Sequence, residues 1–499
     1  MNNISNSSNT NQAIWVGLGK LSTILLSIIS AAILARYFDK KEYGTYKQVL
    51  YIYNTLLILF SAGLQGSFSY FLPKQTMEQG KDFVYRQIKI LILLGFGFSA
   101  FLFFLSPIIA NLFNNPDLKK GLKLFSIVPI FMLPTIGIEG IYASIRKTHI
   151  IAIYTSITRV LMLAMITLPV IFLKGTYMTA LYGWIISSFM IAVISIYLIL
   201  RPFKEFARCQ SKFRIKDIFN YSLPLMVATI YGILIRFADQ FFISRYYGTE
   251  VFAEFSNGFI DLPFVSLVSG AAVTVLLPVF SKYGETADGL ENICKTWKNL
   301  TEKTVILVYP VLVFFLFNAK SSVIALYGEQ YAISAGYFII AMTIGFFDII
   351  VFQTVFFALG KTRLYSRIHL VQAVMIWLAG YLVVNFSGSS FIYALISRLF
   401  YIGQVCVGII YAIKLIGVKA RDIISFKTML KIFFHSSLIC CLTSWLVGLL
   451  DLNVFFRLGL SGLISAGIIL STANFLGIPY WSEFKLMLFN APGFSHFRK

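Results

Sequence analysis

Eight ionisable side chains lie inside otherwise apolar runs of this 499-residue chain, away from the ends of those runs. They are Lys20, Glu139, Arg159, Arg236, Asp239, Asp261, Asp348 and Arg398. A charge at the centre of a membrane-spanning helix costs about 2.5–3.5 kcal/mol, so eight lipid-facing charges would cost on the order of 20–28 kcal/mol. The net stability of a domain is only about 5–15 kcal/mol. These groups must therefore pair with one another or face a wet interior.

The four cations in this set predict a central cationic cavity that binds an anion. They are Lys20, Arg159, Arg236 and Arg398. Arg159 has no acidic neighbour on its own run, and at about 1.5 Å per residue it lies ~15 Å from the start of that run. Its planar guanidinium suits a phosphate group. The alternative is a structural pair between Arg159 and either Glu139 or Asp348, and the side chain of Arg398 can also snorkel to an interface.

The four carboxylates are candidates for ion coupling or for charge balance. They are Glu139, Asp239, Asp261 and Asp348. Asp261 and Asp348 could each carry a coupling H+ or Na+, or could instead balance a neighbouring arginine. Arg236 and Asp239 are three residues apart, so they share a helix face and can form an internal ion pair. The sequence leaves these alternatives open.

The elements that position these residues are predicted to be transmembrane helices. The chain is 58% hydrophobic and only 13% charged, whereas soluble domains carry about 25% charged residues. A spanning helix needs about 20 mostly apolar residues. We count fourteen such runs, of which the ninth is short and could start earlier, near 13–35, 48–72, 88–113, 122–143, 150–173, 177–200, 218–244, 254–280, 304–319, 331–358, 364–386, 391–413, 430–450 and 454–478. The prediction is an all-α polytopic membrane protein.

The distribution of basic residues predicts the orientation. With the N-terminus inside, the cytoplasmic connections and the C-terminal tail hold 27 Lys and Arg, and the opposite loops hold 11. Cytoplasmic loops carry such an excess, so both termini are expected in the cytoplasm. The net charge of +21 is then explained by contacts with anionic membrane lipid, and nucleic acid is not expected as a partner.

Prolines inside the runs mark expected bends. They are Pro129, Pro134, Pro224 and Pro263. In a membrane, carbonyls freed by a bend persist only where they are buried or face a cavity. These positions are therefore hinge candidates, and static kinks are the alternative.

The two halves of the chain repeat one another. "RYFDKKEYGTY" at 36–46 matches "RYYGTEVFAEF" at 245–255, "YFLP" at 70–73 matches "VLLP" at 275–278, and "RKTH" at 146–149 matches "GKTR" at 360–363. Six helices return the chain to its starting side, so the repeats are parallel. Such repeats are a transporter architecture in which one half rocks against the other around a site between them.

The repeat predicts the domain organisation. We expect an N-terminal lobe, a cytoplasmic linker, a C-terminal lobe, two additional helices and a cytoplasmic tail, at 1–203, 204–217, 218–417, 428–480 and 481–499.

On these features the chain resembles the polysaccharide-exporter branch of the multidrug/oligosaccharidyl-lipid/polysaccharide (MOP) flippase superfamily, in particular the Wzx-type flippases. The residues that carry the resemblance are "ILARYFDKKEYGTYKQ", "YSLPL" at 221–225, "DQFFISRYYG" at 239–248 and "FALGKTRLYS" at 357–366. The resemblance implies a MATE-like fold and export of a polyprenyl-pyrophosphate-linked oligosaccharide across a bacterial inner membrane for O-antigen or capsule synthesis. It also implies a polysaccharide polymerase and a chain-length regulator as partners, and no cofactor apart from a coupling ion.

Other functions fit the sequence less well. The five cysteines and four histidines show no metal-ligand or catalytic spacing, and no catalytic motif is found, so an enzyme is not expected. A membrane polysaccharide polymerase or ligase would need a long catalytic loop, which the chain lacks. A drug or cation antiporter of the same superfamily would favour a net acidic cavity. A lipid-linked peptidoglycan-precursor flippase, with fourteen helices and a basic cavity, remains a closer alternative.

Overall fold

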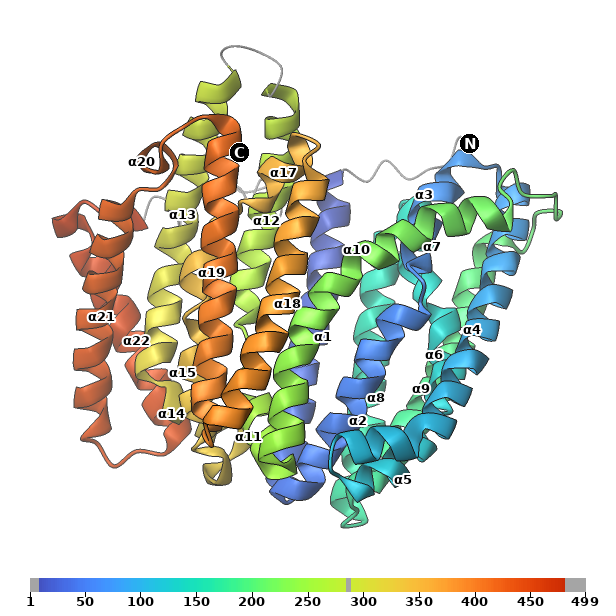
Figure 1. Ribbon diagram of the computed structural model, residues 1–499, viewed down its shortest axis with the longest axis horizontal. Helices are drawn as coiled ribbons and strands as arrows, with labels where there is room; N and C mark the ends of the chain where they lie inside the picture. Colours follow the sequence, from blue (N-terminus) through green and yellow to red (C-terminus); the bar gives the residue numbers. More distant parts are fainter. Residues whose placement is uncertain (1–8, 284–288, 481–499) are drawn as a thin grey trace, which may run out of the picture. The chain divides into compact units, whose positions relative to one another are not determined.

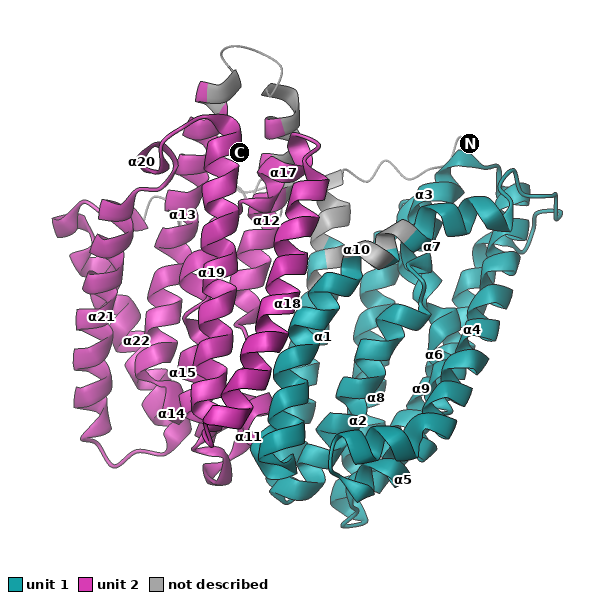
Figure 2. Ribbon diagram, viewed as in Figure 1, with its two compact units in different colours: residues 1–253 teal, residues 254–499 magenta. Residues whose placement is uncertain are grey.

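The computed structural model describes residues 9–283 and 289–480, and that part of the chain contains helices and no β-strand. Figure 1 shows long helices joined by short connections and by shorter helices. The chain divides into two compact units, residues 1–253 and 254–499 (Figure 2).

Unit 1 contains the first half of the helices and their connections. These are α1 (Asn9–Tyr37), α2 (Lys40–Phe60), α3 (Leu64–Phe71), η1 (Leu72–Lys74), α4 (Met77–Leu112), α5 (Pro116–Phe125), α6 (Val128–Met132), η2 (Leu133–Gly137), α7 (Ile138–Ser144), α8 (Thr148–Phe172), α9 (Tyr177–Leu200), η3 (Arg201–Phe203), α10 (Ile215–Phe242) and the π-helical turn η4 (Ile243–Tyr247). The next helix, α11 (Thr249–Gly258), contains the boundary between the units.

Unit 2 contains the remaining helices. These are α12 (Pro263–Tyr283), α13 (Gly289–Phe317), α14 (Ala319–Tyr327), η5 (Glu329–Tyr331), α15 (Ser334–Met342), α16 (Gly345–Asp348), α17 (Gln353–Ala358), α18 (Thr362–Phe386), α19 (Ser390–Ile416), α20 (Ala420–Ile423), α21 (Phe426–Gly448), α22 (Val454–Thr472) and η6 (Asn474–Leu476).

The helices confirm a multi-pass membrane protein. Within the described ranges, ten are long and apolar enough to cross a membrane, and the number is twelve if each of two bent helix pairs forms one span. The other two of the fourteen predicted spans correspond to α10 and to the broken stretch 334–358. The count of fourteen therefore stays a prediction that is compatible with the structure.

The two bent pairs occupy the same place in the sequence repeat, the second span of each half. The segments Lys40–Phe60 and Leu64–Lys74 meet at 45°, and Thr249–Gly258 and Pro263–Val273 meet at 52°. In the first pair, Ala62 and Gly63 have φ angles of 49° and 67°, which ends α2 in the left-handed region. This region is strained for residues other than glycine.

We expect Gly63→Ala to destabilise unit 1 by about 2 kcal/mol, because a side chain is strained at this positive φ. A Cβ on Gly63 would also lie 2.5 Å from the backbone oxygen of Ser222 on α10, so that helix would have to shift. The matched control is Gly97→Ala on α4, where a Cβ meets no heavy atom within 4 Å. Thermal unfolding in detergent should show a lower midpoint for the first variant only. Equal midpoints would contradict the packing at this bend.

The fourth predicted span is broken where the sequence places two prolines. Pro129 and Pro134 stand at the starts of α6 and η2, as expected for a residue that lacks a backbone donor. The backbone oxygen of Ser126, in the break before α6, accepts a hydrogen bond from Oγ of Ser99 on α4. A side chain from a neighbouring helix thus satisfies a freed carbonyl inside the membrane.

The tenth predicted span is broken in the corresponding way but contains no proline. It is divided into α15, α16 and α17, and α16 ends at Asp348. Oη of Tyr309 on α13 donates to the backbone oxygen of Phe346 at 2.9 Å, and Oγ of Ser269 donates to that of Asp348 at 3.4 Å. At equivalent breaks in the two halves, a hydroxyl from a neighbouring helix therefore donates a hydrogen bond to a backbone oxygen.

The remaining hinge candidates lie in different surroundings. Pro263 begins α12 directly after the 52° bend. Pro224 lies in α10 at a position whose side chain is outside the described residues. Structure and sequence agree that Pro129, Pro134 and Pro263 mark breaks, and their role as hinges stays a prediction.

The two copies of the repeated polar segment, residues 36–46 and 245–255, lie against one another in unit 1. A Cβ on Gly44 would lie only 2.2 Å from the backbone oxygen of Thr249. Just beyond the first segment, Nε2 of Gln48 donates to Oγ of Ser244 at 2.6 Å, and both side chains are fully buried. The two segments therefore have a structural role, because they join the start of α2 to the chain that follows α10.

Candidate functional site

Unit 2 contains a buried arginine paired with an aspartate at a helix break. Arg398 on α19 is 5% exposed, and its Nη1 lies 3.3 Å from Oδ1 of Asp261. Asp261 lies in the bend between α11 and α12, and its side chain is 66% exposed. The structure thus brings together two of the predicted charged residues that are far apart in the sequence.

Aromatic rings complete the surroundings of this arginine. The guanidinium carbon of Arg398 lies 4.4 Å from the ring centroid of Phe259 and 5.6 Å from that of Tyr401. Such cation–π contacts stabilise a cation that has lost water. In the part of the chain that the structure describes, Nε of Arg398 has no hydrogen-bond partner. The arginine is therefore held by ring faces and incompletely hydrogen bonded.

A second carboxylate adjoins this pair. Asp348, at the end of α16, is close enough to both Arg398 and Asp261 to interact with them electrostatically. Asp261 forms the ion pair and Asp348 interacts with the guanidinium at longer range, so the three groups together carry one negative charge when both carboxylates are ionised. Such a group can take up a proton or a monovalent cation without creating excess positive charge. We call Arg398, Asp261 and Asp348 the unit 2 charge cluster.

Unit 1 contains a membrane arginine without a direct ion pair. Arg159 on α8 is half-buried, and its Nη1 contacts Sδ of Met162 at 3.8 Å. Glu139 on α7 is exposed and close enough for an electrostatic interaction. Among the described side chains, however, no carboxylate lies within ion-pair distance of Arg159. Its charge is therefore only partly compensated within the unit.

Lys20 lies on the helix that packs along the helix of Arg159. Oγ of Ser22 and Oγ of Ser156 are 2.9 Å apart, and Oη of Tyr37 donates to the backbone oxygen of Ile171 at 3.3 Å, so α1 and α8 run parallel. In this register Lys20 and Arg159 are about 7.5 Å apart along the helix axes. The side chain of Lys20 is exposed. Two of the predicted cations thus lie on adjacent helices at similar depths.

Arg236 and Asp239 on α10 lie in different surroundings. Asp239 is only 5% exposed and interacts with Tyr51, whereas Arg236 is exposed. Within residues 9–283 and 289–480, Arg236 has no carboxylate within ion-pair distance. Spacing of three residues places two side chains on one face, yet here they point into different surroundings. Among the described residues, the alternative of a self-neutralising pair of Arg236 and Asp239 is therefore not seen, and their roles stay predictions.

Sequence reasoning missed another cation, Lys47. The predicted second span began after it, but α2 begins at Lys40, so Lys47 lies two turns inside the helix. Its Nζ lies 5.3 Å from the ring centroid of Tyr43. Asp39 could have marked the true start of α2 in the sequence, because aspartate is a common N-cap residue. Its side chain accepts a hydrogen bond from the backbone N–H of Glu42 at 2.7 Å and caps the helix.

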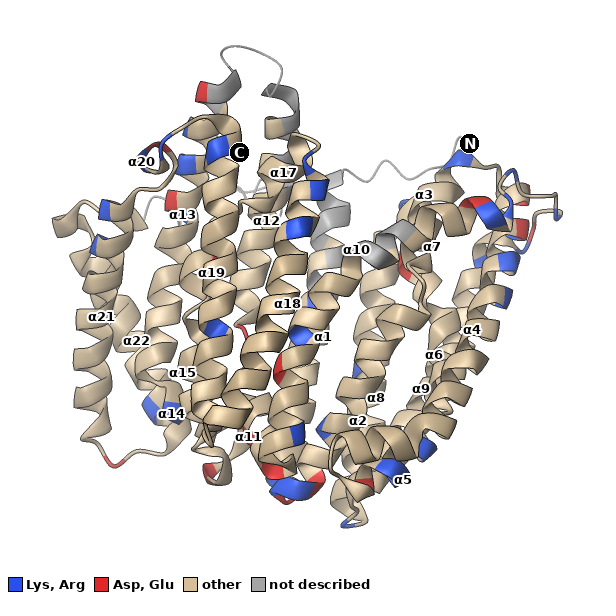
Figure 3. Ribbon diagram, in the orientation of Figure 1, with Lys and Arg blue, Asp and Glu red and all other residues tan. Residues whose placement is uncertain are grey.

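Most other charges lie near helix ends. Figure 3 shows Lys and Arg gathered at the ends of the long helices, with few in between. In the described part of the chain, no group of three or more His, Cys, Asp or Glu side chains could hold a metal ion.

Comparison with known proteins finds a matching family and a related transport protein. Residues 10–284 match the family described as polysaccharide biosynthesis protein. The succinoglycan biosynthesis transport protein ExoT of Rhizobium meliloti (strain 1021) is 22% identical over 323 residues, which cover 64% of this chain and 62% of the relative. The match thus spans less than two thirds of that relative's length.

Solved structures with the same fold belong to membrane transporters. The lipid II flippase MurJ in an inward closed conformation has a TM-score of 0.69 at 16% identity, over 93% of this chain and 98% of that chain. An inward-facing multidrug resistance MATE family transporter of the MOP superfamily has a TM-score of 0.61 at 14% identity, over 81% and 98%. At these identities the likeness shows the fold, and it confirms the MATE-like fold class.

Proposed function

Because the chain belongs to the polysaccharide biosynthesis protein family, we propose that it is a flippase for a polyprenyl-pyrophosphate-linked oligosaccharide. It moves one repeat unit from the cytoplasmic to the outer leaflet of a bacterial inner membrane by alternating access, for the synthesis of O-antigen or capsule. Both termini lie in the cytoplasm. The lobes that move are the predicted segments 1–203 and 218–417, and a polysaccharide polymerase and a chain-length regulator are the proposed protein partners.

The incompletely compensated Arg159 is the observation that carries this proposal. A cation in a membrane-spanning helix without a direct ion pair is costly unless it meets a ligand or water. Lys20 on the adjacent helix adds positive charge at a similar depth. A pyrophosphate is an anion that such a set can bind, and a planar guanidinium can bind its oxygens in pairs.

Ion coupling is assigned to the unit 2 charge cluster. Protonation or sodium binding at Asp261 or Asp348 would weaken the hold of the carboxylates on Arg398. The bend between α11 and α12, where Asp261 lies, could then change its angle. Binding of H+ or Na+ would in this way bias the two access states.

Cells that lack the protein provide the first test. Lipid-linked oligosaccharide should accumulate in the cytoplasmic leaflet, where an added glycosidase cannot reach it in spheroplasts. Expression of the wild-type chain should restore access. Equal access with and without the chain would contradict the proposal.

One further candidate follows from the fold. The likeness to the lipid II flippase favours a lipid-linked peptidoglycan precursor as the alternative substrate. Restored access of that lipid alone, with no effect on oligosaccharide, would favour this second function.

A further inference from the structure

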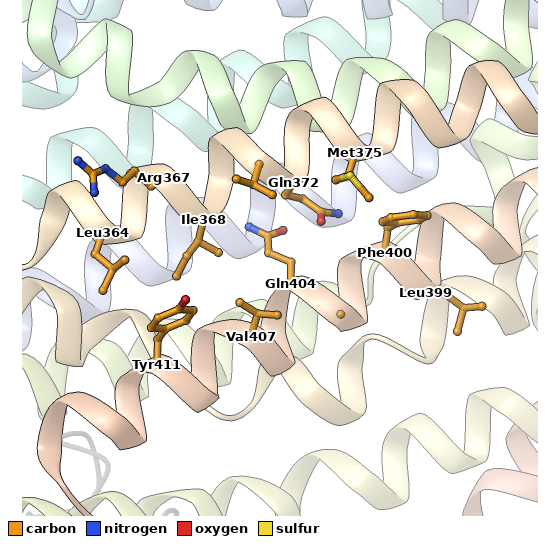
Figure 4. A pocket seen from close by; sticks show the side chains of 12 residues that line it. Leu364, Arg367, Ile368, Gln372, Met375, Leu399, Phe400, Gln404, Val407 and Tyr411 are labelled. Atoms are coloured by element: carbon orange, nitrogen blue, oxygen red, sulfur yellow. The ribbon is translucent and has the colours of Figure 1, made fainter.

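A groove between α18 and α19 in unit 2 lies outside the charged sites described above. Its cavity volume is about 760 Å³, within the usual range of about 300–1,000 Å³ for ligand pockets. Most of its lining is apolar, including Leu364, Val371, Met375, Phe400 and Val407. Figure 4 shows Arg367 at one end of the groove, Met375 and Phe400 at the other, and two glutamines between them.

The glutamines give the groove a polar centre. Gln372 on α18 is 7% exposed, and its Nε2 has no hydrogen-bond partner among the residues that the structure describes. Gln404 on α19 lies in the same space (Figure 4). A buried amide donor without an acceptor is unfavourable. Because Nε2 is itself covered when no ligand is bound, a ligand carbonyl oxygen would satisfy it once the Gln372 amide turns toward the groove.

The positive end of the groove selects an anionic group. The side chain of Arg367 is exposed, and Lys361 and Arg363 precede it at the start of the same helix. Arg367 and Gln372 are five positions apart, or about 7.5 Å along α18. An arginine fork matches a phosphate, and an apolar channel matches a hydrocarbon chain.

We propose that this groove binds one glycerophospholipid. Its phosphate contacts Arg367, an ester carbonyl accepts a hydrogen bond from Nε2 of Gln372, and an acyl chain lies along Met375 and Phe400. A polyprenyl phosphate has no ester carbonyl and would leave Gln372 unpaired. The inference concerns a resident lipid and does not depend on the proposed function.

Gly403 allows the groove to be filled by a substitution. Gly403 lines it, and a Cβ there would meet no heavy atom within 4 Å. Gly403→Leu therefore places a side chain in the ligand space, with room for its Cβ. Gly459→Leu on α22 is the matched control, because a Cβ at Gly459 also meets nothing within 4 Å and the residue is exposed.

The test is native mass spectrometry of the purified full-length protein titrated with three lipids: ester-linked phosphatidylglycerol, its diether analogue and a polyprenyl phosphate. Wild type and Gly459→Leu should bind one ester-linked lipid tightly, and Gly403→Leu and Arg367→Gln should bind it about tenfold more weakly or not at all. Gln372→Leu should lose the preference for ester over diether. Equal binding by Gly403→Leu and wild type, no ester preference in wild type, or tighter binding of polyprenyl phosphate would each overturn the proposal.

Discussion

Replacing Arg398 with glutamine is expected to slow translocation about tenfold or more, a typical size for the loss of coupling between two states. The change leaves Asp261 and Asp348 as neighbouring carboxylates without a counter-charge. Breaking a fully buried pair costs about 3–5 kcal/mol. Because the Asp261 side chain is 66% exposed, we expect a smaller loss of unfolding free energy, about 2 kcal/mol.

A double substitution separates charge from packing in this cluster. Arg398→Gln combined with Asp261→Asn removes one of the two uncompensated carboxylates, so the unfolding midpoint should recover in part while ion dependence of transport is lost. Arg363→Gln is the matched control, because it removes an exposed arginine from the same unit. Additive effects of the two single substitutions on the midpoint would contradict a direct interaction.

Replacing Arg159 with glutamine should reduce translocation of a pyrophosphate-linked lipid by about 10- to 100-fold, since contacts to ionised groups are the strong ones. Arg159→Lys should keep part of the activity, because lysine supplies the charge without the planar fork. The unfolding midpoint should not fall, because no direct ion pair is lost. Rates come from a leaflet assay in vesicles and midpoints from thermal unfolding in detergent.

Met162→Leu is the matched control for Arg159. It removes the sulfur that Nη1 of Arg159 contacts and keeps the apolar volume of the side chain. Its transport rate should equal that of wild type. A large loss of stability in Arg159→Gln with unchanged transport would make Arg159 a structural residue.

The spans and proline breaks could be predicted because apolar run length and missing backbone donors act locally. Pro129 and Pro134 marked a break directly. The equivalent break after Asp348 contains no proline and depends on the donors Tyr309 and Ser269 from other helices, which local sequence does not show.

The sequence predicted which charged residues lie inside the membrane, but it did not predict which of them pair. The sequence named both Arg398 and Asp261, yet their pairing depends on how α19 meets the bend before α12. The spacing of Arg236 and Asp239 allowed a pair, but in the structure Asp239 is buried and Arg236 is exposed. Lys47 was missed because hydropathy placed the start of its helix too late. Contacts between distant segments decide which charges are compensated, and these are absent from a single sequence.

The most direct test of the central claim is a leaflet assay with purified protein in vesicles. The assay compares a labelled polyprenyl-pyrophosphate oligosaccharide, lipid II and a plain phospholipid, with and without H+ and Na+ gradients. We predict that the oligosaccharide lipid moves faster than the other two and that one ion gradient accelerates it. Movement of lipid II alone, or no movement of the oligosaccharide lipid under any gradient, would contradict it.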